Sequence, residues 1–518
     1  MRRVLLVGWD GACWPAIDPL LADGRLPHLA SLLQSGWRTT LRSTVPAVTP
    51  AAWTAMATAL DPGATGVLGF RHLDLRRRSG YCPDLASSAD LRGRTLFELA
   101  SQQGVGVAAL AFPMTWPPFP LRDGVLLAGW PRPETAAAPV LPESMAEALG
   151  PWARRTGPAD PEVTDDGRRD PLAAARERDA RTHRAALHVL ATRADQLVAV
   201  VYQGTDHVAH RAWGLPALDA YLEQVDTWLG ELREAAGPDC DVLLVSDHGF
   251  GPAPDRTVHL GRALEQEGLL TVEPDGSGGS AIAAARAGVS TGLRKRVRDH
   301  LPGTVRRWAW ERGAGIDRIR RADVMRVPLY GPWEGLVVQV EGRQSGGAVP
   351  AADWATCRER AIACMRGLED ERGPLAVHVW RREELWRGPR LAELPDVVVE
   401  LRDDCEGGAG LGPGPLVAPR ERAAGEGSHR RDGIAAGAGP SFIAGEPATP
   451  LLPIDVLPTA LAPLGLAVPE HVHGRARADL LRWAPPRPTL SAVTATAATE
   501  RGGRADIERS LRALGYSS

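Results

Sequence analysis

The sequence predicts an α/β protein built on a doubly wound, mostly parallel β-sheet. Short apolar runs recur along the chain, and segments with helical spacing separate them. A short continuous apolar run is typical of a strand buried on both faces, as in a parallel sheet. Where such strands alternate with helices, polar residues just past the carboxyl ends of the strands gather in one crevice.

The expected elements follow one another in the order strand, helix, strand. Each strand is rich in valine, leucine or alanine and is bounded by turn residues. The expected strands are residues 4–7, 105–111, 197–202, 242–245 and 397–401. The expected helices are residues 29–33, 95–100, 173–191 and 217–235. A further strand-like run lies at residues 336–340.

Changes of composition along the chain predict its domain organisation. We expect residues 1–260 and 391–483 to form the core. Residues 261–390 open with a flexible DGSGGS run, continue into an arginine- and tryptophan-rich stretch at 294–321, and are interpreted as a smaller inserted cap region. Residues 484–518 begin with a segment rich in proline, threonine and alanine, which predicts a linker leading to a short terminal helix.

Composition narrows the class of function. The chain has 518 residues, is 44% hydrophobic and carries a net charge of −3, so no strong field favours nucleic acid or an anionic membrane as partner. No apolar stretch approaches the roughly 20 residues that span a bilayer. The cysteines form no CxxC pair, which favours a reducing compartment, and we expect a cytoplasmic protein. They are Cys13, Cys82, Cys240, Cys357, Cys364 and Cys405.

Two motifs in the first sixty residues have both a structural and a functional interpretation. Asp10 follows the first strand in the sequence Gly-Trp-Asp-Gly, where a turn is the ordinary interpretation. Thr49-Pro50 opens the helical segment 51–60, where threonine serves as an N-cap and proline suits the first helical position. A hydroxyl at that point also lies beside backbone N–H groups that bind phosphate.

Three further motifs supply candidate metal ligands. Asp206 and His210 are four residues apart, so on a helix they share one face and could hold one cation; His207 between them has no assigned role. Asp247-His248 follows a buried strand, where two adjacent polar side chains have few structural uses. His429 lies in a Gly-Ser-His-Arg-Arg-Asp-Gly segment, where an exposed loop histidine is the ordinary interpretation.

Taken together, these side chains form two compact ligand sets. Oxygen and imidazole ligands without cysteine suit zinc, with manganese as the alternative. Two such divalent ions about 4 Å apart would clamp the attacking and leaving oxygens of an in-line displacement at phosphorus. The set comprises Asp10, Thr49, Asp206, His210, Asp247, His248 and His429.

The order of these motifs resembles that of the type I phosphodiesterase and nucleotide pyrophosphatase family, a branch of the alkaline phosphatase superfamily. The resemblance covers about residues 3–260 and 390–480 and implies an alkaline phosphatase-like core. The segments that carry it, besides the ligands, are PAVTPAAW at 46–53, Asp61-Pro62, Gly66-Val67, PMTWPP at 113–118, Glu341-Gly342-Arg343, IDVLPT at 454–459 and residues 511–516.

The resemblance also implies roles for single residues. Thr49 would be the nucleophile of a phosphoester hydrolase that acts on a small-molecule substrate through a phosphothreonine intermediate. The ligands of the first ion would be Asp206, His210 and His429. The ligands of the second ion would be Asp10, Asp247 and His248, with the Thr49 hydroxyl.

Two departures from the family pattern leave the substrate open. The chain contains no asparagine, and Phe70 stands nearest to the place where the family binds a phosphoryl oxygen with that residue. The family's His-Gly pair reads Thr65-Gly66. Dinucleotide cleavage is therefore less expected than cleavage of a smaller phosphoester, phosphonate or sulfate ester. Residues 70–72 are close enough in sequence to line the pocket.

Three other classes of function compete with a phosphoester hydrolase: another enzyme of the same superfamily (a sulfatase or a phosphate-transferring mutase), a non-catalytic binder and a nucleic-acid-binding protein. A sulfatase needs a cysteine or serine to form its aldehyde, which Thr49 cannot supply, whereas a phosphate-transferring mutase would return the phosphate to its substrate. A non-catalytic binder would be expected to have lost some of the seven side chains. Nucleic-acid binding through residues 294–321 is less expected, because Asp299, Glu311 and Asp317 interrupt the arginines. The oligomeric state stays open.

Overall fold

The computed structural model describes residues 2–77, 80–91, 93–131, 140–153, 171–273 and 318–489. The predicted terminal helix, the DGSGGS run and most of the arginine- and tryptophan-rich stretch lie outside these residues. The described chain divides into two compact units, residues 1–70, 85–253 and 423–518 forming the first and residues 71–84 and 254–422 the second. None of the helices within the described ranges is long and apolar enough to cross a membrane.

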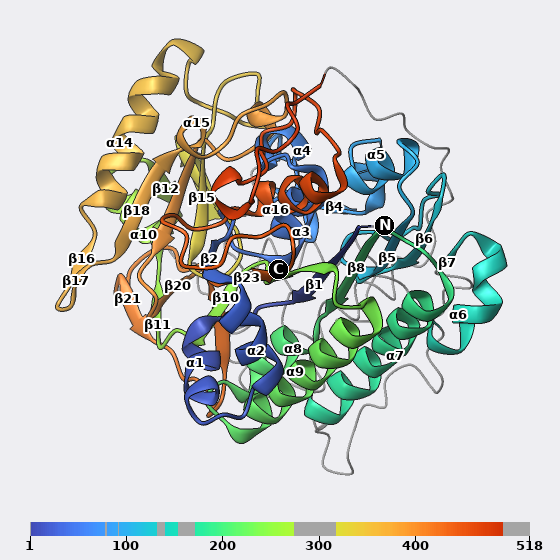
Figure 1. The fold of residues 1–518 in the computed structure, drawn as a ribbon. Helices are drawn as coiled ribbons and strands as arrows, with labels where there is room; N and C mark the ends of the chain where they lie inside the picture. The colour runs from blue at the N-terminus through green and yellow to red at the C-terminus, as the bar shows by residue number, and fades with distance from the viewer. Residues whose placement is uncertain are drawn as a thin grey trace. The chain divides into compact units, whose positions relative to one another are not determined.

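A mostly parallel sheet of eight strands forms the centre of the first unit, in the order β2-β23-β9-β1-β8-β5-β6-β7 (Figure 1). Neighbours from β9 to β6 pair in parallel, and the strands outside them pair antiparallel. The predicted fold class is confirmed, and four of the predicted strands lie in this sheet. The bounds are β1 Arg3–Trp9, β2 Trp37–Arg42, β5 Val107–Phe112, β6 Gly124–Ala128, β7 Val140–Leu141, β8 Leu197–Tyr202, β9 Cys240–Val245 and β23 Asp432–Ala438.

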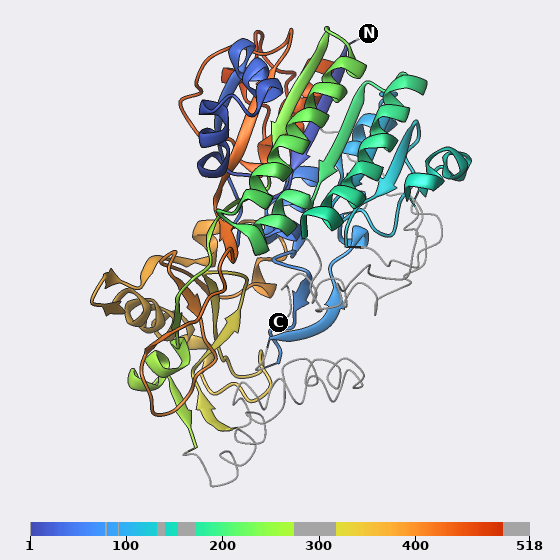
Figure 2. The same cartoon turned by 90° about the horizontal axis from the view of Figure 1, so that it is seen from below.

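Helices cover both faces of this sheet, as the doubly wound pattern predicts (Figure 2). Alternate residues of β1 belong to different cores: Leu5 and Val7 to one, Val4 and Leu6 to the other. The first core includes α1 Trp14–Ala22, α2 Pro27–Ser35, α6 Ala146–Ala153, α7 Pro171–Thr192, α8 Gly204–Ala212 and α9 Pro216–Ala236. The second includes α3 Thr49–Thr58, α4 Pro62–Thr65, α5 Leu96–Gln102 and α16 Pro453–Leu461. All four predicted helices are present.

A buried histidine joins α7 to β8 and α9. His183 Nδ1 lies 2.8 Å from the Tyr202 hydroxyl and its Nε2 2.7 Å from Glu231 Oε2, while its ring stacks on Trp228 at 5.2 Å. Burial lowers the pKa of His183, and Glu231 offsets this only in part. At this imidazole the unfolded state therefore binds a proton more readily than the folded state at acid pH. The stability that the neutral imidazole supplies is present above about pH 6.5 and is lost as the pH falls.

We expect His183→Gln to flatten this acid decline. Between pH 7 and pH 5 the free energy of unfolding should fall less steeply than in the wild type, by at most about 1.4 kcal/mol per pH unit for one proton. Urea unfolding followed by circular dichroism at several pH values measures the slope. His188→Gln, on the same helix, serves as the control. An unchanged slope in the His183 variant would assign the acid sensitivity to other groups.

The second unit contains an antiparallel sheet in the order β14-β15-β19-β18. The prediction that residues 397–401 continue the core sheet is wrong, because β19 pairs antiparallel with β15 and β18. An apolar run shows that a strand is buried but not which sheet buries it. The unit comprises β3 Arg71–Leu73, β4 Tyr81–Leu85, β11 Arg256–Val258, α10 Leu260–Gln266, β12 Leu270–Val272, β13 Ile319–Ala322, β14 Val324–Pro328, β15 Trp333–Val338, α14 Trp354–Arg366, β16 Glu369–Asp370, β17 Gly373–Pro374, β18 Ala376–Arg381, α15 Arg382–Leu385, β19 Val397–Leu401, β20 Cys405–Gly407 and β21 Val417–Pro419.

The bounds of this unit differ from the predicted insertion. Residues 71–84 belong to it, and it runs from 254 to 422 instead of from 261 to 390. The difference at the carboxyl end follows from the pairing of β19 and of β20 and β21, which join β11 in a separate small sheet.

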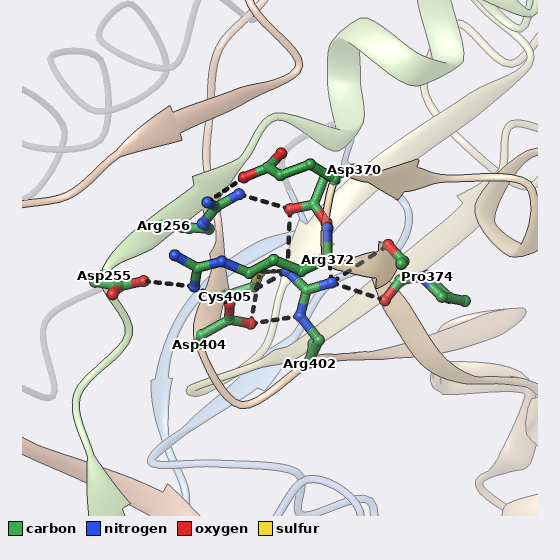
Figure 3. A network of polar contacts seen from close by, with 10 residues as sticks. Asp255, Arg256, Asp370, Arg372, Pro374, Arg402, Asp404 and Cys405 are labelled. Atoms are coloured by element: carbon green, nitrogen blue, oxygen red, sulfur yellow. Dashed lines mark hydrogen bonds and ion pairs between the residues drawn. The ribbon is translucent and has the colours of Figure 1, made fainter.

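A network of ion pairs joins several segments of the second unit. Arg402 lies between Asp370 and Asp404, and Arg256 binds Asp370 from the other side at 2.7 Å (Figure 3). The hydrogen bond from Arg402 holds the pKa of Asp370 at about 2, so this carboxylate stays charged at neutral pH. The Arg343 of the Glu-Gly-Arg motif donates to the fully buried Asp396 at 2.7 Å. This contact gives the motif a structural role in the second unit.

Candidate metal centre

Three adjacent parallel strands place the candidate carboxylates at one edge of the central sheet. Asp10 follows β1, Asp206 lies on α8 just after β8, and Asp247 follows β9. In the register of the sheet, Gly8 of β1 is paired with Val201 of β8 and with Val245 of β9. The three strands therefore end at the same level of the sheet. The backbone N–H of Asp10 donates to the carbonyl of Tyr202 at 3.0 Å and fixes this exit.

Thr49 is the first residue of α3. Val48 before it is extended, and Pro50 after it takes the position that tolerates a missing N–H. The Thr49 side chain is 1% exposed, and its Oγ1 lies 3.5 Å from His248 Nε2. The hydroxyl therefore meets the candidate ligands at the start of a helix, where backbone N–H groups favour an anion.

One group of candidate ligands consists of Asp206, His210 and His429. Asp206 Oδ1 lies 3.1 Å from His429 Nε2 and 3.4 Å from His210 Nε2, and the two Nε2 atoms are 3.1 Å apart. The Nδ1 atom of His429 lies 3.0 Å from the carbonyl of Ala47, and that of His210 lies 3.3 Å from the carbonyl of Gly427. Such bonds orient imidazoles so that the opposite nitrogen faces a metal.

His429 reaches this group through a strand pair. It lies in β22 (Gly427–Arg430), which pairs antiparallel with β10 (Gly249–Pro252), directly after His248. Phe250 is level with His429 in the register, and the rings of His248 and His429 stack at 3.7 Å. Burial, and then the proximity of His248, lowers the pKa of His429 to about 3. The imidazole is therefore neutral, which is the form that binds a metal.

The second group centres on His248, whose Nε2 lies 3.4 Å from Asp247 Oδ2, 3.7 Å from Asp10 Oδ1 and 3.9 Å from Asp206 Oδ1. The outer oxygens of two of these carboxylates are held by the protein: Trp53 Nε1 donates to Asp10 Oδ2, and the backbone of Gly11 donates to Asp247 Oδ1, each at 3.1 Å. Asp206 is close to both groups of ligands, so it lies between them.

Two carboxylate oxygens of this centre are suited to bind divalent cations. Asp10 Oδ1 and Asp247 Oδ2 are buried and have no hydrogen-bond partner within the described ranges. Burial, followed by repulsion from Asp247 and Asp206, raises the pKa of Asp10 well above its ordinary value. Such a cluster of buried carboxylates is costly without a counter-charge. The oxygen and imidazole donors would suit zinc or manganese.

The sequence profile of the type I phosphodiesterase / nucleotide pyrophosphatase family matches residues 4–402. The chain belongs to this family. The match includes six of the seven candidate residues and ends before His429. Members of this phosphodiesterase family are phosphoester hydrolases, and the chain is assigned to that class of enzyme. Among curated proteins, no sequence matches it.

Solved structures of phosphoester and phosphonate hydrolases share the fold of this phosphodiesterase family member. Phosphonoacetate hydrolase from Sinorhizobium meliloti 1021, in complex with phosphonoformate, has a TM-score of 0.55 at 16% identity, covering 88% of this chain and 94% of that chain. Human ectonucleotide pyrophosphatase / phosphodiesterase 5 has a TM-score of 0.50 at 12% identity, covering 93% of this chain and all of that chain. At these identities the likeness is one of fold.

In this family member, α8 is anchored where it begins. The backbone N–H of Gly204, the first residue of α8, donates to Asp179 Oδ2 at 2.7 Å, and the Tyr221 hydroxyl donates to the same oxygen at 2.5 Å. A Cβ atom on Gly204 would lie 2.1 Å from that hydroxyl. A glycine is therefore required here, two residues before Asp206, because only then can α7 and α9 approach the start of α8.

We expect Gly204→Ala to lower the free energy of unfolding by about 1–3 kcal/mol, since the new methyl group must displace the Tyr221 ring. Thermal unfolding of the purified variant measures this loss. Gly69→Ala is the matched control, because a Cβ atom there meets no heavy atom within 4 Å. Equal melting temperatures for the two variants would show that Tyr221 moves aside without cost.

The sequence interpretation left His207 without a role, yet in this phosphodiesterase family member it contacts the centre. His207 is 7% exposed, and its Nε2 lies 3.9 Å from Asp206 Oδ2. Its Nδ1 lies 2.5 Å from Nη1 of Arg178. Burial, followed by the charge of Arg178, lowers the pKa of His207 well below its ordinary value, so Nδ1 accepts a hydrogen bond from the guanidinium. No spacing rule connects residues 178 and 207.

Proposed function

We propose that this chain is a two-metal phosphoester hydrolase in which Thr49 is the nucleophile. The observation that carries the proposal is the position of the Thr49 hydroxyl, 3.5 Å from His248 and at the first residue of a helix. The same His248 Nε2 lies 3.7 Å from Asp10 Oδ1 and 3.4 Å from Asp247 Oδ2, two buried oxygens without a hydrogen-bond partner among the described residues. A nucleophile, an anion-binding helix start and cation ligands are thus within one cluster.

The ligand sets that we propose follow the two groups of contacts. Asp206, His210 and His429 would hold one ion. Asp10, Asp247 and His248, with the Thr49 hydroxyl, would hold the other. Zinc is proposed first, and manganese is the alternative. When bound, the ions would lower the pKa of a coordinated hydroxyl and neutralise the charge of the phosphoryl oxygens.

The proposed reaction then proceeds through two displacements at phosphorus. The Thr49 oxygen gives up its proton to solvent and forms a bond to phosphorus while the ester bond to the leaving alcohol breaks, and the departing oxygen takes up a proton. The N–H groups in the first turn of α3 stabilise the negative charge on the phosphoryl oxygens. Water then attacks the phosphothreonine, which releases the phosphate and restores the hydroxyl.

The substrate that we propose is a small phosphoester. The chain contains no asparagine to bind a phosphoryl oxygen, so cleavage of dinucleotides is less favoured. A sulfatase would need an aldehyde that a threonine cannot form. The likeness to phosphonoacetate hydrolase supports including phosphonates among the substrates tested.

Metal analysis combined with a substrate screen tests the proposal. Purified protein is dialysed, its metals are measured, and it is assayed on aryl phosphomonoesters, phosphodiesters, phosphonates and sulfates. We expect about two divalent ions per chain and turnover of a phosphoester that chelators abolish. Preferential turnover of sulfates would contradict the proposal. Return of labelled phosphate to another position of the same substrate would assign the alternative, phosphate transfer.

A further inference from the structure

Arg178 on α7 presents a cationic group beside the candidate metal centre. Its Nε donates to Asp179 Oδ1 at 3.0 Å and its Nη1 donates to His207 Nδ1 at 2.5 Å. Its Nη2 is buried and has no hydrogen-bond partner in the part of the chain that the structure describes. Buried donors in proteins nearly always have a partner, and none of the described residues supplies an acceptor for this nitrogen.

The two hydrogen-bond partners of Arg178, Asp179 and His207, do not accept from its Nη2 atom. The second oxygen of Asp179 already accepts from Gly204 and from Tyr221, so it cannot turn toward Nη2. His207 accepts through one nitrogen and faces Asp206 with the other, at 3.9 Å. The guanidinium is therefore separated from a candidate ligand of the first ion by a single imidazole.

Two aromatic rings lie in a row beside the imidazole of His207. The ring of Trp130 meets that of His207 edge-on at 5.8 Å, and the ring of Phe70 meets that of Trp130 at 4.7 Å. Phe70 is 8% exposed, and Trp130 is half-buried. An arginine donor and two aromatic rings thus adjoin His207, the immediate neighbour of Asp206.

We propose that Arg178, Trp130 and Phe70 form a subsite for the leaving group of the substrate, and that this group carries an anionic substituent such as a carboxylate. The inference rests on the proposed function. A guanidinium binds carboxylates through parallel N–H bonds, and an aromatic wall suits the organic part of an ester. A second anionic group on the substrate would need a hydrogen-bond donor outside the metal centre, and Nη2 of Arg178 supplies one.

A matched pair of ligands without an ester bond tests the subsite by binding alone. Metal-loaded wild-type protein is titrated by calorimetry with 3-phosphonopropionate and with propylphosphonate, which lacks the carboxylate. We expect the carboxylate to improve affinity about tenfold or more. The preference should vanish in Arg178→Met and survive in part in Arg178→Lys, which keeps the charge but not the fork.

The matched control is Arg181→Met, since Arg181 lies on the same helix and pairs with Glu177. It should keep the wild-type preference. If Arg178→Met does not fold, a reduced preference in Arg178→Lys supports the subsite, and an unchanged one overturns it. A preference that persists in Arg178→Met, or equal weakening of both ligands, also overturns the subsite but leaves the hydrolase intact. Failure of both ligands to bind, together with no turnover of any ester, overturns the proposed function and the subsite together.

Discussion

Thr49→Ala is expected to lower kcat on any phosphoester substrate by at least about 10³-fold, because the alanine side chain has no hydroxyl to form the covalent intermediate. The variant should still bind about two divalent ions. Asp10, Asp247 and His248 keep their own contacts to Trp53, Gly11 and the carbonyl of Gly249. Steady-state kinetics and metal analysis of the same preparation measure the two quantities together.

Two further measurements separate a nucleophile from a residue that merely shapes the site. Thr49→Ser keeps a hydroxyl at the first residue of α3 and should retain far more activity than the alanine variant. Acid quenching of the wild type during turnover, followed by peptide mass spectrometry, should show phosphate on Thr49. Wild-type rates in Thr49→Ala would remove the threonine from the mechanism.

The core of the fold was predictable because its strands are buried on both faces. Residues 197–202 and 242–245 are continuous apolar runs, and both lie next to β1 in the parallel sheet. The same criterion failed for residues 397–401, which are equally apolar but pair antiparallel in the second unit. Local hydrophobicity reports burial, whereas the choice of sheet depends on partners far away in the chain.

The part of the candidate site that was predictable consists of residues that come after the ends of strands. Asp10, Asp206 and Asp247 come directly after strands that are adjacent in the sheet, so their proximity follows from the topology. His429 is different, because it reaches the centre only through the pairing of β22 with β10. The family resemblance, and not a strand end, implies its place in the first ligand set. Arg178 belongs to no motif, and only its contact with His207 at 2.5 Å brings it to the centre.

Asp206→Ala is expected to have the largest effect on metal content. Asp206 Oδ1 lies within 3.4 Å of both histidines of the first group and 3.9 Å from His248 of the second. Its removal would take one ligand from the proposed first ion and a counter-charge that both proposed ions share. We expect the variant to bind fewer ions than the wild type after dialysis, measured by elemental analysis. Asp219→Ala, which removes an exposed carboxylate paired with Arg25, is the control.

The stability of Asp206→Ala, measured with metal and with a chelator, should distinguish a role of Asp206 in metal binding from a role in packing. With free ion at roughly 100 times its Kd, the wild type gains about 2.7 kcal/mol of stability for each bound ion, and the variant should lose at least one such contribution. With a chelator present this difference should disappear, because both proteins are then without metal. A smaller loss should remain, because contacts with His210 and His429 outweigh burial and lower the pKa of Asp206 well below its ordinary value. Thermal unfolding with and without chelator measures both values. An equal loss of stability in the two conditions would mean that Asp206 supports the fold and not a cation.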